Sequence, residues 1–455
     1  MEKNQLIELT IKDQSKDGRG IGSCEGLIAF VDGCVLGDRV SARVTKLKKR
    51  YAIAKVEEIL ESSEHRIDDV CPYIDECGGC AFGKLKYDIQ LELKERHVRD
   101  VLERIGGIEN PKLEPIISMQ EPYNYRNKAR LAIHPKTHSV GFLGRMSHKV
   151  IDCHECRLQS EAVVAVADAL RKSFDAKGDS NKIKKLVVKT SFSSGEVMVV
   201  PTVDDKDLDL ESFIYAVDES INAIPSFDDG FEYYLSSVAL DVSEQKPSKQ
   251  HKTRAEIIAG RPAIEDGLLG LAFEISPYSF YQVNPVQAER LYEKAVEYAG
   301  IKGGETVLDL YCGVGTIGLF MARAGAGKVI GIELVKEAVL NANRNAVING
   351  IVNAIYYTGK AEEELPRLRE EGEIEKADVV ILDPPRKGCD EALLKAVVET
   401  EADRIVYISC DPATMSRDVK YLVENGYEYV KGTPLDMFAH TGHVECIALI
   451  QRVKS

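Results

Sequence analysis

Cys410 stands where a nucleophile would be useful. It follows Arg404–Ser409, an almost continuous apolar run that predicts a short buried strand, and Asp411-Pro412 comes directly after it. In an open α/β sheet, ligands bind at the carboxyl ends of the strands, and a thiol there can attack an electrophilic carbon. The alternative is a free cysteine that packs as a small apolar residue, and this stretch alone leaves both interpretations open.

A glycine loop follows another predicted strand. Three glycines match the G-x-G-x-x-G spacing of dinucleotide-binding folds: Gly313, Gly315 and Gly318. Glu333 ends the next predicted strand, where a carboxylate can bind ribose hydroxyl groups. The glycine pattern alone is weak, but Asp309, inside the first strand, favours an S-adenosylmethionine site.

Polar residues stand at two further positions that could border a pocket. Asp383 ends an apolar strand and opens the sequence Asp-Pro-Pro-Arg. Gln282 and Asn284 precede a predicted helix, and their amides could hydrogen-bond to a ligand. Phe280 and Tyr281 could then wall an adenosine or base pocket. The alternative is an ordinary domain junction.

Three closely spaced cysteines, Cys71, Cys77 and Cys80, predict a metal centre. The glycines between the last two let the backbone wrap tightly around it. A fourth thiolate must come from elsewhere, and Cys153 and Cys156 are the candidates. Four thiolates suit zinc or an iron–sulfur cluster. One C-x-x-C pair with a lone cysteine and a distant ligand favours [4Fe–4S] over the paired zinc pattern.

The elements that must position these residues form three predicted domains. Residues 1–62 alternate between glycine turns, which predicts a small OB-like β-barrel. Residues 63–265 hold the clustered cysteines, an amphipathic helix near 84–105, several strands and a polar loop at 243–254. Residues 266–455 alternate strands and helices, which predicts a Rossmann-like sheet closed by an antiparallel hairpin. The expected fold class is therefore α/β.

Basic residues predict contact with RNA, although the net charge of −14 argues against bulk non-specific binding of nucleic acid. The run Lys46–Arg50 precedes Tyr51 in the barrel, and an aromatic beside cations suits a stacked base and its phosphates. Arg126, Lys128 and Arg130 would share one strand face and form a phosphate track. A solvated turn and a solvated sheet face are the alternatives.

The composition places the chain among soluble globular proteins. No apolar run reaches membrane length, and the N-terminus lacks the apolar stretch of a signal peptide. Eleven cysteines in 455 residues do not form a secreted disulfide scaffold. We expect a cytoplasmic monomer without a membrane or an obligate protein partner.

With these motifs in view, the sequence resembles the RNA uracil-5-methyltransferase family, in particular its iron–sulfur, TRAM-domain branch that modifies 23S ribosomal RNA. The resemblance covers nearly the whole chain, including the barrel and the cysteines. It also rests on five motifs: Ser279–Asn284, Asp309–Thr316, Leu382–Arg386, Ser409–Thr414 and His443–Glu445.

The resemblance implies roles for these residues. Cys410 would be the nucleophile and Glu445 the base. Four residues would contact S-adenosylmethionine: Gln282, Tyr311, Glu333 and Asp383. A [4Fe–4S] cluster would be held by four cysteines: Cys71, Cys77, Cys80 and Cys156. Cys156 matches the family better than Cys153, because Cys-x-Leu-Gln follows the family's pattern there.

The residue types suit this chemistry. Carbon 5 of uracil is a poor nucleophile, but a thiolate that adds to carbon 6 makes it an enolate carbon that can attack a sulfonium methyl. A base such as Glu445 must then remove the carbon-5 proton so that the thiolate can leave. The target uridine must first be unstacked. Arg386 stands where exocyclic-amine methyltransferases carry an aromatic residue, which favours the covalent route.

Three alternatives differ in what they explain. An NAD-dependent oxidoreductase would use the glycine loop but leave Cys410, Glu445 and Asp383 without roles. A non-catalytic RNA-binding iron–sulfur protein would not need the cysteine and glutamate pair. A transfer-RNA uridine methyltransferase would use the same chemistry on another RNA and is the nearest alternative.

Overall fold

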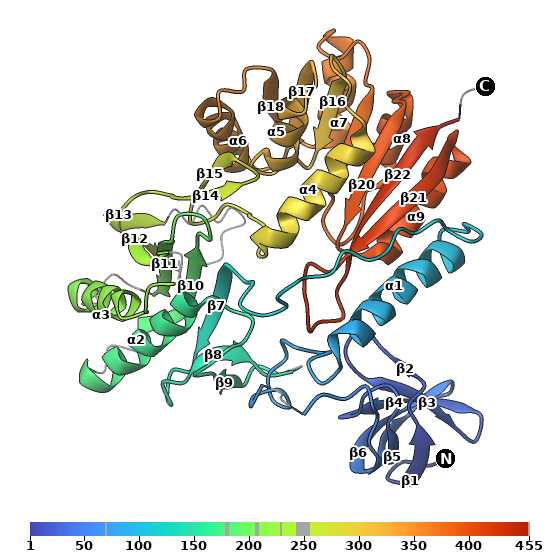
Figure 1. Cartoon of the computed structure of the whole chain (residues 1–455), viewed down its shortest axis with the longest axis vertical. Helices are drawn as coiled ribbons and strands as arrows, with labels where there is room; N and C mark the ends of the chain where they lie inside the picture. Colours follow the sequence, from blue (N-terminus) through green and yellow to red (C-terminus); the bar gives the residue numbers. More distant parts are fainter. Residues whose placement is uncertain are drawn as a thin grey trace.

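A computed structural model describes residues 1–68, 71–145, 147–177, 182–204, 209–227, 230–242 and 255–453. The described residues form three large sheets and one two-stranded hairpin, arranged as three bodies along the chain (Figure 1). The loop predicted at 243–254 lies outside the described residues.

The N-terminal body is a six-stranded sheet with the order β1-β5-β6-β4-β3-β2. Its strands are β1 Leu6–Thr10, β2 Asp13–Gln14, β3 Gly20–Cys24, β4 Leu27–Asp32, β5 Arg39–Leu47 and β6 Tyr51–Glu61. Alternate residues point inward and build a small core that includes Leu9, Val31, Val40 and Ala54. The sheet curls over this core, and the predicted barrel is confirmed.

The cysteine segment and helix α1 (Tyr87–Arg104) connect the barrel to the rest of the chain. The apolar stripe predicted for this helix packs in two places. Ile89 and Leu93 join a cluster with Val35 of the N-terminal body, whereas Val98 and Leu102 join the core beside the C-terminal sheet. The chain then runs along strand β21 (Tyr427–Leu435), with bridges from Leu113 to Gly432 and from Ile117 to Leu435.

The central body is a seven-stranded sheet with the order β13-β12-β11-β10-β7-β8-β9. Its elements are β7 Lys128–Ile133, β8 Val140–Leu143, β9 Val150–Asp152, α2 Glu161–Lys177, β10 Ile183–Thr190, β11 Glu196–Val203, α3 Leu210–Asn222, β12 Tyr234–Val242 and β13 Glu256–Gly260. Helices α2 and α3 share one buried apolar cluster with this sheet. The hairpin β14 (Ile264–Leu268) and β15 (Leu271–Ile275) leads to the last body.

The C-terminal body has a seven-stranded sheet with the order β18-β17-β16-β19-β20-β22-β21, in which only the last two strands run antiparallel to their neighbours. Its strands are β16 Thr306–Leu310, β17 Lys328–Glu333, β18 Ala354–Thr358, β19 Val379–Leu382, β20 Arg404–Ser409, β21 Tyr427–Leu435 and β22 Glu445–Arg452. Its helices are α4 Pro285–Ala299, α5 Thr316–Arg323, α6 Lys336–Ile348, α7 Ala361–Glu370, α8 Glu391–Glu399 and α9 Pro412–Glu424.

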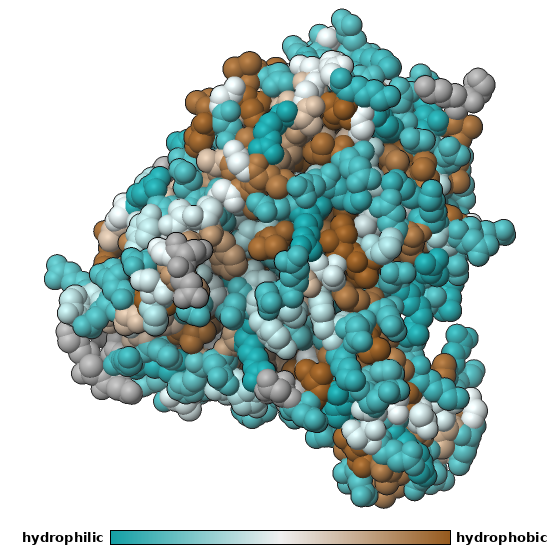
Figure 2. Space-filling model, in the orientation of Figure 1, coloured by the Kyte–Doolittle hydropathy of each residue, from teal (hydrophilic) through white to brown (hydrophobic). Residues whose placement is uncertain are grey.

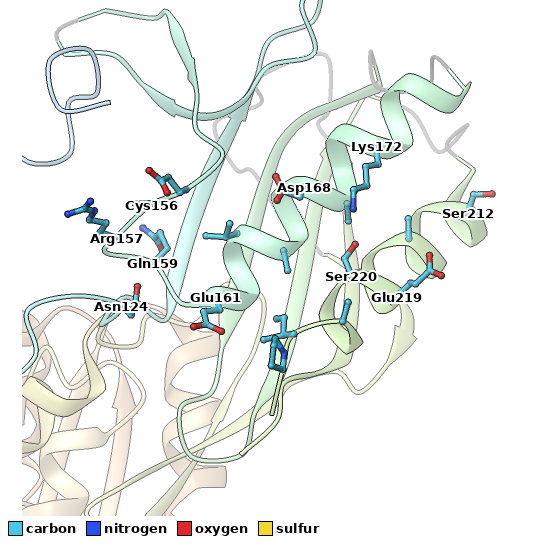
Figure 3. A pocket seen from close by; sticks show the side chains of 18 residues that line it. Asn124, Cys156, Arg157, Gln159, Glu161, Asp168, Lys172, Ser212, Glu219 and Ser220 are labelled. Atoms are coloured by element: carbon cyan, nitrogen blue, oxygen red, sulfur yellow. The ribbon is translucent and has the colours of Figure 1, made fainter. Parts of the chain in front are cut away.

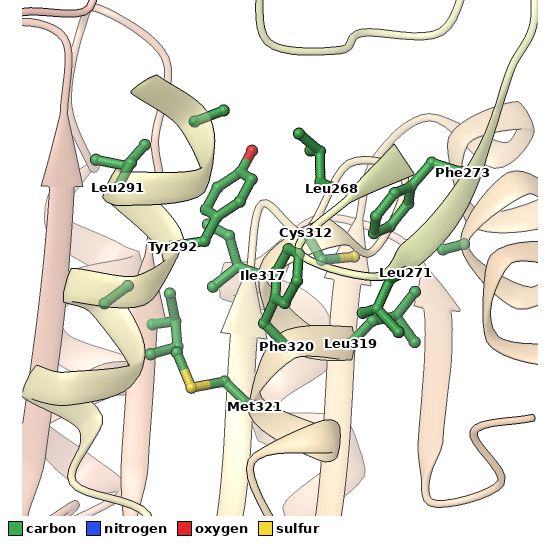
Figure 4. Packing of buried hydrophobic residues seen from close by; sticks show 14 of the residues in the cluster. Leu268, Leu271, Phe273, Leu291, Tyr292, Cys312, Ile317, Leu319, Phe320 and Met321 are labelled. Atoms are coloured by element: carbon green, nitrogen blue, oxygen red, sulfur yellow. The ribbon is translucent and has the colours of Figure 1, made fainter. Parts of the chain in front are cut away.

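Both faces of this sheet are covered, which explains its nearly continuous apolar strands. Val307 and Val406 face a core shared with α4, α5 and the β14–β15 hairpin. Figure 4 shows this packing, with Tyr292 of α4 beside Phe320 of α5. Leu308 and Tyr407 face the opposite core with α7, α8, α9 and α1. The Rossmann-like prediction is confirmed.

The surface is mainly hydrophilic on the face shown in Figure 2, with apolar residues gathered on the barrel at the lower end of the view. The barrel has five aliphatic or aromatic residues with more than a third of their surface exposed: Leu6, Ile28, Leu47, Tyr51 and Ile59. Within the described part of the chain, no helix is both long and apolar enough to cross a membrane.

Candidate active site

Cys410 and Glu445 come together at the carboxyl end of β20. Strands β20 and β22 are antiparallel, and their last registered pair joins Ser409 to Cys446. The next pair in this register is Cys410 with Glu445. Residues that face each other in this way lie on one side of a sheet, with Cβ atoms roughly 5 Å apart. The two residues implied as nucleophile and base are therefore neighbours, although 34 residues separate them in sequence.

The turn after β20 holds Cys410 at the start of a helix. The Ser409 hydroxyl accepts a hydrogen bond from the Asp411 amide at 3.0 Å, which tightens the turn. Asp411 then caps α9, because its carboxylate accepts a hydrogen bond from the Ala413 amide at 3.1 Å. Cys410 is left half-buried at this strand-to-helix junction.

Glu445 is buried, with 5% of its surface exposed. Burial and the nearby Asp383 carboxylate raise the pKa of Glu445 to about 8, against the opposing charges of Arg386 and Lys16. Burial also raises the pKa of Asp383 to about 7, although the residue keeps some exposed surface. The pKa of Cys410 is raised to about 11, first by burial and then by the charge of Glu445, while Arg386 lowers it.

A second group of predicted residues lines up along the same edge of the sheet. The parallel registers of β16 with β17 and β19, extended by one residue, place Tyr311 between Glu333 and Asp383. Glu333 is held by the glycine loop, since its carboxylate accepts hydrogen bonds from the Gly313 amide at 3.2 Å and the Val335 amide at 2.8 Å. Tyr311 takes a left-handed backbone conformation with φ of 65° at this bend.

Asp309 is hydrogen-bonded to the segment that follows the glycine loop. It is fully buried, and one carboxylate oxygen accepts a hydrogen bond from the Gly318 amide at 2.8 Å. A Cβ at Gly318 would come within 2.9 Å of that oxygen, which explains why this position needs glycine. The other oxygen, Oδ1, is buried without a hydrogen-bond partner among the described residues, as expected beside the binding site of a ligand with donor groups.

The segment before α4 contains Gln282 and two aromatic residues, Phe280 and Tyr281. The two aromatic side chains have different surroundings. Tyr281 is buried and packs on Phe273, with ring centroids 6.4 Å apart, whereas Phe280 is 64% exposed. The expectation that both rings wall one pocket is wrong, because successive residues of an extended segment point to opposite sides. Asn284 instead caps α4 by accepting a hydrogen bond from the Gln287 amide at 3.2 Å.

Tyr292 is a site residue that the sequence did not reveal. Its position on α4 fits the apolar stripe of that helix, so its spacing indicates only a core residue. Burial and then the charges of Asp383, Asp309 and Glu445 raise its pKa, while the nearby Gln282 side chain lowers it. Tyr292 therefore lies close to Gln282 and to the carboxylates of Asp383, Asp309 and Glu445.

The clustered cysteines line one cavity, to which Cys71, Cys77, Cys80, Cys153 and Cys156 all contribute. Nearby backbone N–H groups favour the thiolate forms of three of them and so lower their pKa against the effect of burial: Tyr73 acts on Cys71, Gly79 on Cys77, and Leu158 on Cys156. No three His, Cys, Asp or Glu side chains of the described residues are grouped so as to hold a metal ion.

Cys156 and Cys153 differ in their surroundings. Cys156 and Cys80 pack around the same small apolar cluster, which includes Tyr125 and Leu158. Cys153 lies deeper, and its thiol donates a hydrogen bond to the Glu155 carbonyl at 2.8 Å. This arrangement leaves Cys156 better placed than Cys153 to join the other three thiols.

The two predicted groups of basic residues fare differently. All of Lys46–Arg50 is exposed between β5 and β6, next to the exposed Tyr51 ring. In contrast, Arg126 packs against the rings of Tyr125 and Phe438, and burial lowers the pKa of Lys128. The three cations do share one face, because the residues between them are buried, but only Arg130 is fully exposed on it. The phosphate track stays a prediction.

A further hollow of about 860 Å³ lies between α2, α3 and the chain around Cys156 (Figure 3). Its rim is mainly acidic, with Glu155, Glu161, Asp168 and Glu219. None of its lining residues belongs to the Rossmann-like sheet. It is therefore separate from the site around Cys410.

A Rossmann-like sheet with a glycine loop, an acid after its second strand and an antiparallel final hairpin defines an S-adenosylmethionine-dependent methyltransferase. Comparison with known proteins narrows this class. Residues 267–453 match the family described as tRNA (uracil-5-)-methyltransferase, and residues 2–56 match the TRAM domain.

Relatives over the whole chain agree with these matches. The chain is 40% identical to a protein named as an uncharacterized RNA methyltransferase of Caldanaerobacter subterraneus subsp. tengcongensis, over 99% of this chain and 98% of that one. A protein of the same description from Halalkalibacterium halodurans is 37% identical, with the same coverage.

The chain is also similar in structure to a solved uracil-5-methyltransferase. The crystal structure of Pyrococcus abyssi tRNA (uracil-54, C5)-methyltransferase with S-adenosyl-L-homocysteine superimposes with a TM-score of 0.73 and 28% identity, covering 98% of this chain and all of that one. The chain belongs to the RNA uracil-5-methyltransferase family, with an N-terminal TRAM domain.

Proposed function

We propose that this enzyme methylates carbon 5 of a uridine in 23S ribosomal RNA through a covalent adduct of Cys410 that Glu445 resolves. The observation that carries the mechanism is the pairing of these two residues across β20 and β22, at the carboxyl end of the sheet. S-adenosylmethionine supplies an electrophilic methyl group.

The proposed steps need these two side chains, the RNA base and the methyl donor. The thiolate of Cys410 adds to carbon 6 of uracil, which gives carbon 5 the electron pair that forms its bond to the methyl group, while the bond between that methyl group and the donor sulfur breaks and its electron pair stays on the sulfur. Glu445 then accepts the carbon-5 proton, the bond between carbon 6 and sulfur breaks, and the thiolate is restored. Glu445 finally returns the proton to solvent.

The electrostatics of the site support this division of roles. A pKa of about 8 lets Glu445 accept and release a proton near neutral pH, which is what a general base requires. While Glu445 is protonated, its charge no longer opposes the Cys410 thiolate, and Arg386 stabilises that thiolate. Cys410 therefore ionises most easily when Glu445 holds a proton, and Glu445 must lose that proton to solvent before it can accept the one on carbon 5.

We further propose that S-adenosylmethionine lies along the edge formed by Tyr311, Glu333 and Asp383, with Gln282 beside it. The unpartnered oxygen of Asp309 and the bent glycine loop support a ligand at this edge. In this assignment residues 266–455 perform catalysis, residues 1–62 bind RNA, and residues 63–265 hold the cluster and part of the RNA surface.

We propose that a [4Fe–4S] cluster is held by four cysteines: Cys71, Cys77, Cys80 and Cys156. The cavity that all four line, together with nearby backbone N–H groups that favour the thiolates of Cys71, Cys77 and Cys156, supports this. When bound, the cluster would crosslink two segments that are far apart in sequence. The four thiols would act as its ligands, and Cys153 would remain beside them.

The choice of RNA rests on the combination of a TRAM domain with this cysteine set, which favours 23S ribosomal RNA. The transfer-RNA activity named for the Pyrococcus abyssi relative supports the alternative, the same chemistry on a transfer-RNA uridine. Mapping of 5-methyluridine in both RNA classes from a deletion strain decides between them. Loss of the mark from ribosomal RNA alone is expected, and loss from transfer RNA alone would favour the alternative.

The mechanism is tested by two variants. Cys410→Ala removes the nucleophile and should abolish methylation without forming an adduct. Glu445→Gln keeps the nucleophile, so a methylated protein–RNA adduct should accumulate, survive denaturing electrophoresis and carry label from methyl-labelled S-adenosylmethionine. Normal turnover by Glu445→Gln would move the base to another group, with Asp383 or a water it holds as the next candidate. Methylation by Cys410→Ala would exclude the covalent route.

A further inference from the structure

A loop of the TRAM barrel reaches the catalytic end of the C-terminal sheet. The loop joins β2 to β3, and Lys16 lies at its outer end. The Lys16 carbonyl oxygen packs against Gly442 so closely that a Cβ there would come within 2.1 Å of it. The Lys16 ammonium group lies 3.5 Å from the carboxylate of Asp411, the residue next to Cys410.

The loop is held rigidly in this position. The buried Gln14 side chain donates hydrogen bonds to the Gly18 carbonyl at 2.8 Å and to the Cys34 carbonyl at 3.3 Å. The Ser15 hydroxyl accepts a hydrogen bond from the Arg19 amide at 3.0 Å. A Cβ at Gly18 would come within 2.4 Å of the Ala81 carbonyl, in the segment that follows Cys80. Lys16 is therefore placed by the barrel itself and does not depend on a mobile tail.

Lys16 also lines a groove of about 980 Å³ that runs from the barrel past Cys77 and Cys80 to Thr441–His443, the segment just before Glu445. Lys55 and Arg145 line it toward the barrel and the central body, and Thr441 and His443 line its catalytic end. Two of the groove's cations are paired with carboxylates, Lys84 with Asp75 and Arg145 with Asp32. Among the residues that the structure describes, the Lys16 ammonium group has only the long contact with Asp411, and its side chain keeps 35% of its surface exposed.

The charge of Lys16 already acts on the catalytic residues. It opposes the rise in the pKa of Glu445, and it adds to burial in lowering the pKa of His443 to about 4. A half-exposed ammonium group that borders a groove beside the nucleophile is well suited to a phosphate of an incoming strand. Its pairing with Asp411 would orient it before RNA binds.

We propose that Lys16 is a substrate-binding residue of the active site, which the TRAM barrel contributes, and that its ammonium group binds the RNA backbone phosphate next to the target uridine. This inference rests on the proposed methylation of uridine. The proposed function gives the barrel a role in RNA binding only in general. This inference adds a contact between the barrel and the RNA at the nucleotide that reacts.

The test compares Lys16→Gln with the wild-type protein on an RNA fragment that the wild type methylates. The variant should raise KM for RNA about tenfold, as expected for one charged hydrogen bond, and leave KM for S-adenosylmethionine unchanged. The dependence of RNA affinity on salt should flatten by a slope of about 0.7. Lys16→Arg should restore both quantities. Lys12→Gln, which removes an exposed lysine of the same barrel, should behave as wild type.

A second variant separates phosphate binding from a purely structural ion pair. Asp411→Asn keeps the helix cap but removes the charge that Lys16 contacts, so KM for RNA should stay the same or fall. If Asp411→Asn instead reproduced the defect, and the double variant added nothing, the ion pair would be the whole effect and the proposal would be wrong. An unchanged salt slope in Lys16→Gln would overturn it equally. Wild-type protein that methylated no uridine would refute the proposed function and not this contact alone.

Discussion

Replacement of Glu445 by glutamine should stabilise the C-terminal body at high pH, and the structure gives the size of the effect. The pKa of Glu445 rises from 4.5 to about 8 on folding, mainly because the side chain is buried. At about 1.4 kcal/mol for each pH unit, this rise corresponds to a penalty of ~5 kcal/mol once the buried group is ionised. Glutamine has nearly the same shape and is never ionised.

The direction in which the free energy of unfolding changes with pH follows from the number of protons bound by the folded and unfolded states. Below pH 4.5 the carboxyl group is neutral in both states and carries no penalty. As the pH rises from 4.5 to about 8, the unfolded chain releases this proton while the folded protein keeps it, so the free energy of unfolding falls. Above pH 8 the folded protein carries the full penalty. Asp383 and Asp309 titrate in both proteins, and most of their contribution cancels in the difference.

The assay is amide hydrogen exchange of β22 across a urea series, from pH 5 to pH 9, which reports the free energy of opening this body. The advantage of Glu445→Gln over wild type should grow by ~4 kcal/mol over this range. Glu428→Gln, an exposed glutamate on the neighbouring strand β21, is the matched control and should show no such trend. A difference that stays constant with pH would show that Glu445 is ionised and solvated in the folded protein, and the reasoning would fail.

Three other perturbations are informative. Glu333→Ala should weaken S-adenosylmethionine binding by about 1.5–3 kcal/mol in calorimetry, and unchanged affinity would remove Glu333 from the pocket. Lys94→Met should destabilise the protein by about 3–5 kcal/mol in urea denaturation, because it leaves Asp436, 2.5 Å away, buried and unpaired. Lys94→Met with Asp436→Leu should recover most of that loss, and no recovery would contradict the ion-pair explanation. Cys71→Ser should bleach a brown, anaerobically purified protein and lower its iron content, whereas stoichiometric zinc in wild type would exclude the cluster.

The sequence predicted the positions of many site residues, because short-range patterns of apolar and turn residues determine where strands end. The apolar run 404–409 coincides with β20, and Glu333 is the last residue of β17, as the alternation of strands and turns predicts. The positions of Cys410 after one strand and Asp383 after another follow from the same pattern. Parallel strands end at one edge of a sheet, so their terminal residues are brought together by topology alone.

The tertiary structure alone determined the contacts between segments that are far apart in the sequence. No local sequence pattern predicts these contacts. Glu445 faces Cys410 because β22 inserts antiparallel beside β20, and a shift of one residue in that register would turn the carboxylate to the other face. Tyr292 has the spacing of a core residue, and only the packing of α4 places its hydroxyl beside Gln282. Lys16 lies nearly 400 residues before Asp411, and its place at the active site depends on the docking of one folded body on another. Such docking is set by shape and buried polar contacts across the whole interface, which leave no periodic signal in the sequence.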